Sequence, residues 1–192
     1  MRGHAIVDHA DDDHDLIRKS IRGDLSSFRK LVERHQHYIY RLAFRTLLNK
    51  EEAEDMVQDT FIKVWLNLRH FDFRGKFTTW IYRITVNQCI DKLKRMNRLA
   101  DYAASSMENN LDRLNDQNEM KRLEDKDMAA FIKMQADHLS PKQRLVFILR
   151  DLQDLSIEEV CQIMKMTKGS VKTNLYLARN TIRLNLIKTG EG

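Results

Sequence analysis

Apolar side chains recur at intervals of three and four residues through most of this chain. That spacing places them on one face of a helix, whereas a strand would alternate them every second residue. The periodic stretches run over residues 16–47, 53–68, 78–90, 145–152 and 160–182. Six Gly and one Pro leave few helix-breaking positions. The pattern therefore predicts an all-α fold.

Changes in composition divide the chain into four parts. Residues 1–14 are rich in Asp and His and predict a disordered acidic lead, while residues 15–98 predict a first helical domain. Residues 99–137 are rich in Asp, Glu and Asn, which predicts an acidic flexible linker. Residues 138–188 predict a second helical domain, in which Ser140 caps a helix that starts at Pro141. The expected architecture is two small helical domains joined by that linker.

The second domain contains a helix-turn-helix pattern over residues 155–183. Ser156 is placed to cap a short helix, and Thr167 to cap a longer one with Val171, Leu175, Ala178 and Ile182 on its core face. Between Glu159 and Glu191 the sequence has no acidic residue, although six Lys and Arg fall there. A short helix, a turn and a basic second helix are typical of a DNA-reading motif. The alternative is an ordinary helical hairpin with a basic solvated face.

Composition excludes several classes of protein. No apolar run approaches the roughly 18 residues of a membrane span, so we expect no membrane insertion. The acidic start is unlike a secretory signal, and we expect a cytoplasmic protein. Cys89 and Cys161 lie in separate helical segments and are expected to be small buried apolar residues. His4, His9 and His14 have no element that would bring them together, so no metal or cofactor site is expected.

Three sequence blocks carry a family pattern. They are residues 54–61 (EDMVQDTF), 77–87 (FTTWIYRITVN) and 139–144 (LSPKQR), and the helix-turn-helix follows the third. In this order and spacing, over about residues 15–188, they resemble the bacterial extracytoplasmic-function (ECF) sigma factors. The resemblance implies an alternative sigma factor: a bacterial transcription initiation subunit that binds core RNA polymerase and promoter DNA, usually held inactive by an anti-sigma protein. It implies no enzyme, and the sequence shows no catalytic motif.

The resemblance assigns three surfaces to this chain. The first, from residues 54–61, would bind the polymerase clamp through Asp55, Gln58 and Asp59. A purely solvated acidic face is the alternative interpretation of these residues. The second would read and melt the −10 element, where single-stranded bases are held by aromatic and polar groups with cations along the backbone. Its residues would be Phe73, Arg74, Lys76, Thr79, Arg83, Asn87, Asp91, Lys94 and Arg95.

Within the second surface, Asn87 and Asp91 are the candidate base readers and Lys94 and Arg95 the candidate phosphate contacts. Trp80, in the same helix, is expected to belong to the core. The third surface would read the −35 element with Lys168, Ser170, Lys172, Thr173, Tyr176 and Arg179. Lys172, Thr173 and Tyr176 would face base edges, and Lys168 and Arg179 phosphates. The sequence departs from the family pattern at Asn174 and Leu177, where Arg is frequent.

Two other classes compete with this interpretation. A free-standing helix-turn-helix regulator would bind duplex DNA without polymerase. In such a protein the acidic face at residues 58–59 and the aromatic–basic loop before residue 77 would have no function. A helical interaction module, such as an anti-sigma-like adaptor, would not need two separate basic faces. Binding of promoter DNA with and without core polymerase separates the three classes.

Overall fold

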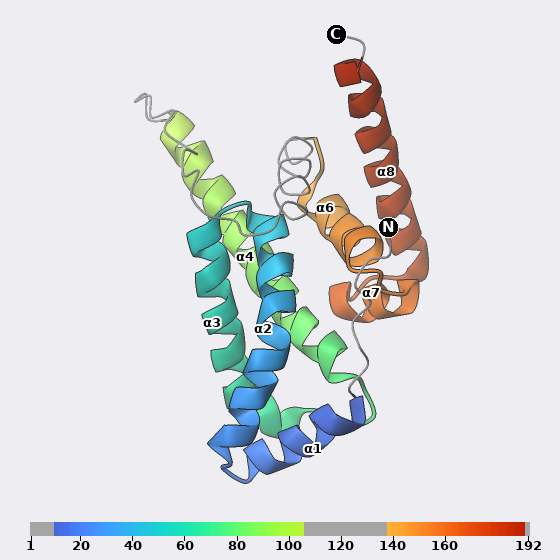
Figure 1. The fold of residues 1–192 in the computed structure, drawn as a ribbon. Coiled ribbons are helices and arrows are strands. Elements are labelled where there is room, and N and C mark those ends of the chain that lie inside the picture. The colour runs from blue at the N-terminus through green and yellow to red at the C-terminus, as the bar shows by residue number, and fades with distance from the viewer. Residues whose placement is uncertain (1–9, 106–137, 191–192) are drawn as a thin grey trace.

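The computed structural model of the chain describes residues 10–105 and 138–190. All elements in this described part are helical (Figure 1). The first group is α1 (Ala10–Ile21), α2 (Leu25–Leu47), α3 (Lys50–Asn67), the 3₁₀ turn η1 (Leu68–His70) and α4 (Phe77–Ser105). The second group is α6 (Pro141–Phe147), the π-helical turn η2 (Ile148–Leu152), α7 (Ile157–Met164) and α8 (Lys168–Gly190). The all-α expectation is confirmed for these residues.

Side-chain caps fix where the helices begin. Asn49 accepts a hydrogen bond from the Glu52 backbone N–H at 3.0 Å and starts α3. Ser140 and Ser156 form capping boxes that start α6 and α7. The Thr167 hydroxyl accepts from the Ser170 N–H at 3.2 Å and starts α8. The caps at Ser140, Ser156 and Thr167 were expected from the sequence, and each of the four satisfies a backbone donor that a helix terminus leaves free.

Helix α2 is the centre of the first group and packs against α1, α3 and α4. Its Leu31, Ile39 and Leu42 are fully buried, together with Val64 of α3 and Ile81 of α4. In the second group, α8 packs against α6 and α7. The predicted core stripe of this helix is confirmed, because its four members, Val171, Leu175, Ala178 and Ile182, are all buried.

The two groups pack against each other. One continuous core cluster contains buried side chains from both, because α4 lies against α7 and α2 lies against η2. Polar contacts also bridge the two groups: Arg144 donates to the Thr46 carbonyl at 3.1 Å, and Arg45 to the Leu152 carbonyl at 3.4 Å. In Figure 1 the α6–α8 group accordingly lies beside the α2–α4 bundle. We call this the closed arrangement.

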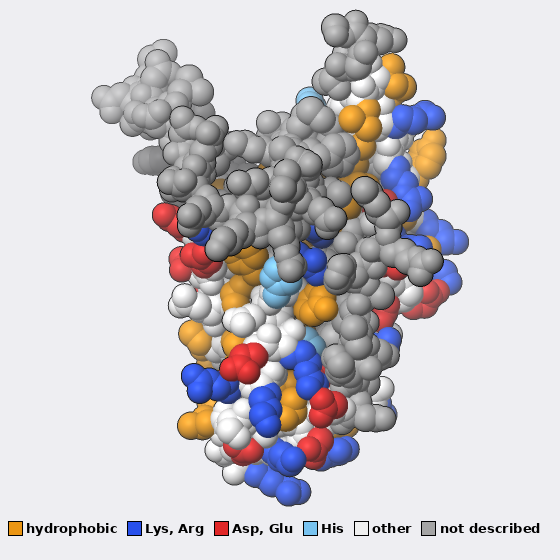
Figure 2. Space-filling model, in the orientation of Figure 1, with side chains coloured by type: hydrophobic (Ala, Val, Ile, Leu, Met, Phe, Trp, Pro, Cys, Tyr) orange, Lys and Arg blue, Asp and Glu red, His pale blue; other side chains and the backbone are white. Residues whose placement is uncertain are grey.

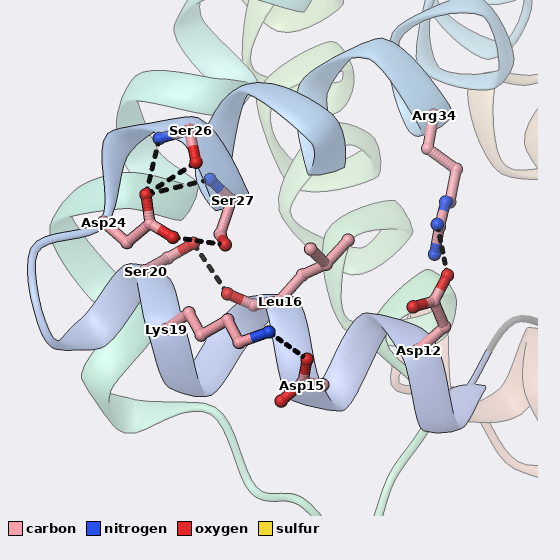
Figure 3. Close-up of polar contacts among 9 residues, drawn as sticks. All are labelled: Asp12, Asp15, Leu16, Lys19, Ser20, Asp24, Ser26, Ser27 and Arg34. Carbon is pink, nitrogen blue, oxygen red and sulfur yellow. Dashed lines mark hydrogen bonds and ion pairs between the residues drawn. The ribbon is translucent and has the colours of Figure 1, made fainter.

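Two helices extend across predicted boundaries. Helix α1 begins at Ala10, so the last residues of the predicted disordered lead are helical. The reason is that Asp12 and Asp13 pair with the next helix, and Figure 3 shows Arg34 of α2 meeting Asp12 at one end of α1. Helix α4 also continues to Ser105, past the predicted start of the linker. Residues 106–137 and 1–9 lie outside the described part, and so do the predictions made for them.

Asp13 is the buried attachment point of α1. Its carboxylate is 2% exposed, accepts from Arg34, and lies 2.8 Å from Nε2 of the buried His35. Burial acts to raise the pKa of Asp13, but the hydrogen bonds and charges of His35 and Arg34 outweigh it, so the pKa is lowered. The pairing thus stabilises the fold when Asp13 is ionised.

Replacing Asp13 with Asn should therefore destabilise the protein in a pH-dependent way. A carboxyl whose folded-state pKa is lowered contributes its stability above the ordinary value of 3.8 and loses it as pH falls further. Asp13→Asn should lower the free energy of unfolding by about 1–3 kcal/mol at pH 7. The difference from wild type should shrink below about pH 4, as measured by urea unfolding at several pH values. Asp15→Asn, at an exposed pair with Lys19, is the control and should change little. A gap that stayed constant down to pH 3 would contradict this account.

Candidate nucleic-acid and polymerase interfaces

The residues expected to face polymerase lie together on α3. Asp55, Gln58 and Asp59 are all exposed, one turn apart on the helix surface opposite its core side. The core side is held in place by Thr60, whose buried hydroxyl donates to the Gln88 side chain of α4 at 2.9 Å. This bond and the surrounding packing fix which face of α3 points outward.

The same face continues as an apolar surface. Ile62 and Leu66 follow Asp55 by seven and eleven residues and are 57% and 62% exposed. Trp65 lies beside them, 38% exposed, with its ring 4.8 Å from that of Phe28. Exposed large apolar side chains next to charged ones are typical of a protein-binding surface. This extension was not predicted from the sequence, although the seven- and eleven-residue spacing from Asp55 places Ile62 and Leu66 on the same helix face. We call residues 55, 58, 59, 62 and 66 the α3 face.

The loop between η1 and α4 is built on aromatic side chains. Phe71 is buried and contacts the rings of Phe73, Phe77 and Trp80 at centroid distances of 5.2–5.8 Å. Trp80 is half-buried against the core, as the core interpretation expected. The aromatic cluster therefore holds the loop against α4, and its polar residues point outward.

Both cations of this loop are already paired. Arg74 donates to both carboxylate oxygens of Asp72 at 2.8–3.0 Å, and this guanidinium holds the pKa of Asp72 below its usual range. Lys76 lies 3.4 Å from Glu159 of α7, a contact that joins the two helical groups. The structure thus places both loop cations among the −10 candidates in internal ion pairs.

The remaining −10 candidates follow one row along α4. Thr79 and Arg83 are half-buried, and the row continues with the exposed residues Asn87, Asp91, Lys94 and Arg95. Their spacing of three and four residues makes them neighbours along the helix surface. Lys94 lies 3.9 Å from Asp91. The structure therefore brings the predicted residues from Thr79 to Arg95 onto a single helical surface.

The helix-turn-helix presents its expected reading residues to solvent. Lys172, Thr173 and Tyr176 are exposed on α8, and Tyr176 is 69% exposed. Ser170 is half-buried, and its backbone is held by the cap at Thr167. In Figure 2 basic side chains gather along the edge of the molecule that α8 forms. The geometry matches that of a recognition helix, whose outer face enters the major groove.

The expected phosphate contacts of this domain are paired within it. Lys168 lies 2.6 Å from Glu158, a residue of the first helix of the motif. Arg179 donates to both carboxylate oxygens of Asp151 at 2.6 and 2.8 Å. Asn174, at a position where the family often has Arg, donates its side chain to the Ser170 carbonyl and so faces its own helix.

The two cysteines lie in different environments. Cys89 is buried, and burial raises its pKa to about 12, which makes the thiol inert. Cys161 is half-buried rather than buried as expected. Among the described residues, no helix is both long and apolar enough to span a membrane.

Comparisons with known proteins agree with this geometry. The family described as Sigma-70 region 2 matches residues 31–99, and the family described as Sigma-70, region 4 matches residues 132–182. The ECF RNA polymerase sigma factor SigW of Bacillus subtilis is 30% identical over 184 residues, which cover 89% of this chain and 97% of SigW. The RNA polymerase sigma-H factor of Pseudomonas aeruginosa is 28% identical over 180 residues, covering 88% and 91%.

Solved structures share the fold. CnrH, in complex with the cytosolic domain of CnrY, superposes with a TM-score of 0.67 at 23% identity, covering 92% of this chain and 97% of CnrH. RpoE of Bartonella quintana, in complex with the anti-sigma factor NepR, has a TM-score of 0.65 at 22% identity, covering 84% and 98%. With both sigma regions in order and SigW similar over nearly its full length, this chain belongs to the ECF sigma factors of RNA polymerase.

Proposed function

We propose that this chain, an alternative sigma factor that directs promoter-specific transcription initiation, divides its tasks among three surfaces. The α3 face binds core polymerase, the loop before α4 and the outer row of α4 bind the melted −10 strand, and α8 reads the −35 duplex. The observation that carries the proposal is their separation: each set of exposed candidate residues lies on a different element. The chain itself is not an enzyme, and it acts in the cytoplasm with the polymerase.

The α3 face suits a protein partner. Its acidic end can steer association with a basic surface, and its apolar end adds area that is buried on binding. Duplex DNA is a poor fit, because carboxylates repel phosphates. The domain from residues 15–98 therefore carries both polymerase binding and −10 recognition, and residues 138–188 carry −35 recognition.

Changing the acidic end of the α3 face should weaken polymerase binding. The double variant Gln58→Ala, Asp59→Lys reverses a charge on an exposed helix surface, so it should leave helicity unchanged. Its affinity for core polymerase should fall at least tenfold, because a like charge then faces the partner. Affinity is measured by fluorescence titration of labelled protein with core polymerase. Glu33→Lys, on the exposed side of α2, is the control. Unchanged affinity of the double variant would remove α3 from the polymerase interface.

The two DNA tasks should separate on different templates. Lys172→Ala should cost about 1–3 kcal/mol at a matched −35 base pair, the range for a good base-edge contact. Because the −35 element stays paired, this loss should persist on a template already melted at −10. Asn87→Ala should instead weaken holoenzyme binding to a single-stranded −10 oligonucleotide that lacks any −35 sequence. Open-complex formation on duplex, pre-melted and single-stranded templates measures both. Equal losses by the two variants on every template would contradict the division.

The closed arrangement bears on regulation. Lys76 of the −10 surface contacts Glu159 of the second group, and α4 packs against α7. The two DNA surfaces are therefore tied together by the same interface. We infer that the two groups change their relative position when polymerase binds. CnrH and RpoE, which share this fold, were solved with partner proteins. By analogy, an anti-sigma protein is the expected inhibitory partner of this chain.

A further inference from the structure

Helix α1 contacts the loop of the −10 surface directly, although neither matched sigma region includes it. His14 lies 3.3 Å from the Gly75 carbonyl through Nε2, and its ring lies 5.5 Å from that of Phe73. One turn later, the Arg18 guanidinium lies over the Phe73 ring, 4.9 Å from its centroid. Phe73 therefore joins the loop to α1, and the Arg18 guanidinium covers one face of its ring.

Arg18 differs from the other charged groups of α1. Three carboxylates of this helix have cationic partners: Asp12 and Asp13 pair with Arg34, and Asp15 pairs with Lys19 at 2.7 Å. The Asp15–Lys19 pair and the Asp12–Arg34 pair are both visible in Figure 3. Arg18 is exposed, and the described residues give it no acidic partner. Its positive charge is therefore not neutralised within the described structure.

The two loop cations, Arg74 and Lys76, are in contrast already paired with carboxylates. Arg74 must leave Asp72, and Lys76 must leave Glu159, before either can bind a phosphate with its full charge. Arg18 needs no such exchange. Stacking on Phe73 also restricts the guanidinium, so less conformational entropy is lost on binding. Of these three cations around the loop, Arg18 is the one ready to receive an anion.

We propose that Arg18 of α1 is part of the strand-binding surface and contacts a backbone phosphate of the melted −10 strand. The guanidinium stacks on Phe73 and keeps donors at its edge, the arrangement that suits phosphate recognition. His14 is a positioning residue that anchors the loop through the Gly75 carbonyl. An aromatic side chain beside cations is the usual composition of a single-strand binding surface. This inference rests on the proposed function, because it assumes that the loop meets melted DNA.

The experiment measures binding of the holoenzyme to the single −10 strand of a promoter that this holoenzyme has selected from a random duplex library. Affinity is determined at several salt concentrations for wild type, Arg18→Ala and Arg18→Met. Each phosphate contact to a single strand contributes about 0.7 to the slope of log affinity against log salt. Both variants should reduce the slope by that amount. They should also lower affinity about fivefold at moderate salt, the size of one exposed ion pair.

Two controls separate charge from packing. Lys19→Ala removes the neighbouring exposed cation, which is paired with Asp15, and should leave slope and affinity unchanged. Arg18→Met keeps an apolar stem over Phe73 without the charge. If Arg18→Met bound the strand as wild type does, Arg18 would only pack on the loop and the inference would be overturned. An unchanged salt slope in Arg18→Ala would overturn it as well.

Failure of the inference can be told from failure of the proposed function. Suppose that wild-type holoenzyme binds the strand, that Asn87→Ala weakens this binding and that the Arg18 variants bind as wild type does. Then only the role of Arg18 is wrong. If wild-type holoenzyme does not bind the strand at all, the assignment of the −10 surface is wrong, and the role of Arg18 falls with it.

Discussion

The burial of apolar side chains between α4 and α7 is the constraint on which the rest of the structure depends. Each helix has its own group of partners, yet their buried side chains form one continuous core. Apolar burial is the main favourable term in such packing, and the polar bridges at Thr46 and Leu152 add to it. The Lys76–Glu159 ion pair is partly exposed and contributes little by itself. Apolar packing therefore stabilises the closed arrangement, and the Lys76–Glu159 ion pair forms because that packing brings the two side chains together.

Three cations of the candidate DNA surfaces pair with nearby carboxylates. Arg74 pairs with Asp72, Lys168 with Glu158 and Arg179 with Asp151, each within one helical group. Exposed pairs of this kind are weak, so a phosphate can replace the carboxylate at small cost. We expect this internal pairing to lower the net attraction to arbitrary DNA, while Lys172 and the other exposed candidate reading residues of α8 stay available. Non-specific attraction depends on cation charge, so this pairing favours sequence-specific over general binding.

The sequence predicted local structure better than contacts between distant segments. Caps such as Asn49 and Thr167 depend on residues three positions apart, and the core stripe of α8 depends on helical periodicity, so both could be predicted. The attachment of α1 could not, because it depends on Asp13 meeting His35 across two helices. Periodicity shows that a helix has an apolar face but not which partner covers it. For that reason the packing of α4 on α7 was beyond prediction. The apolar part of the α3 face was missed for another reason: Ile62 and Leu66 look like core residues until the structure exposes them.

From these features we expect promoter recognition by this chain to depend on polymerase. In the closed arrangement the proposed −10 and −35 surfaces are connected through the packing of α4 on α7, and several of their cations are in internal ion pairs. The most direct test is to measure binding to a selected duplex promoter by the chain alone, by core polymerase alone and by both together. We expect tight, sequence-specific binding and strand opening only when both are present. Specific binding by the chain alone, unchanged on addition of core polymerase, would contradict the account and indicate a free-standing regulator.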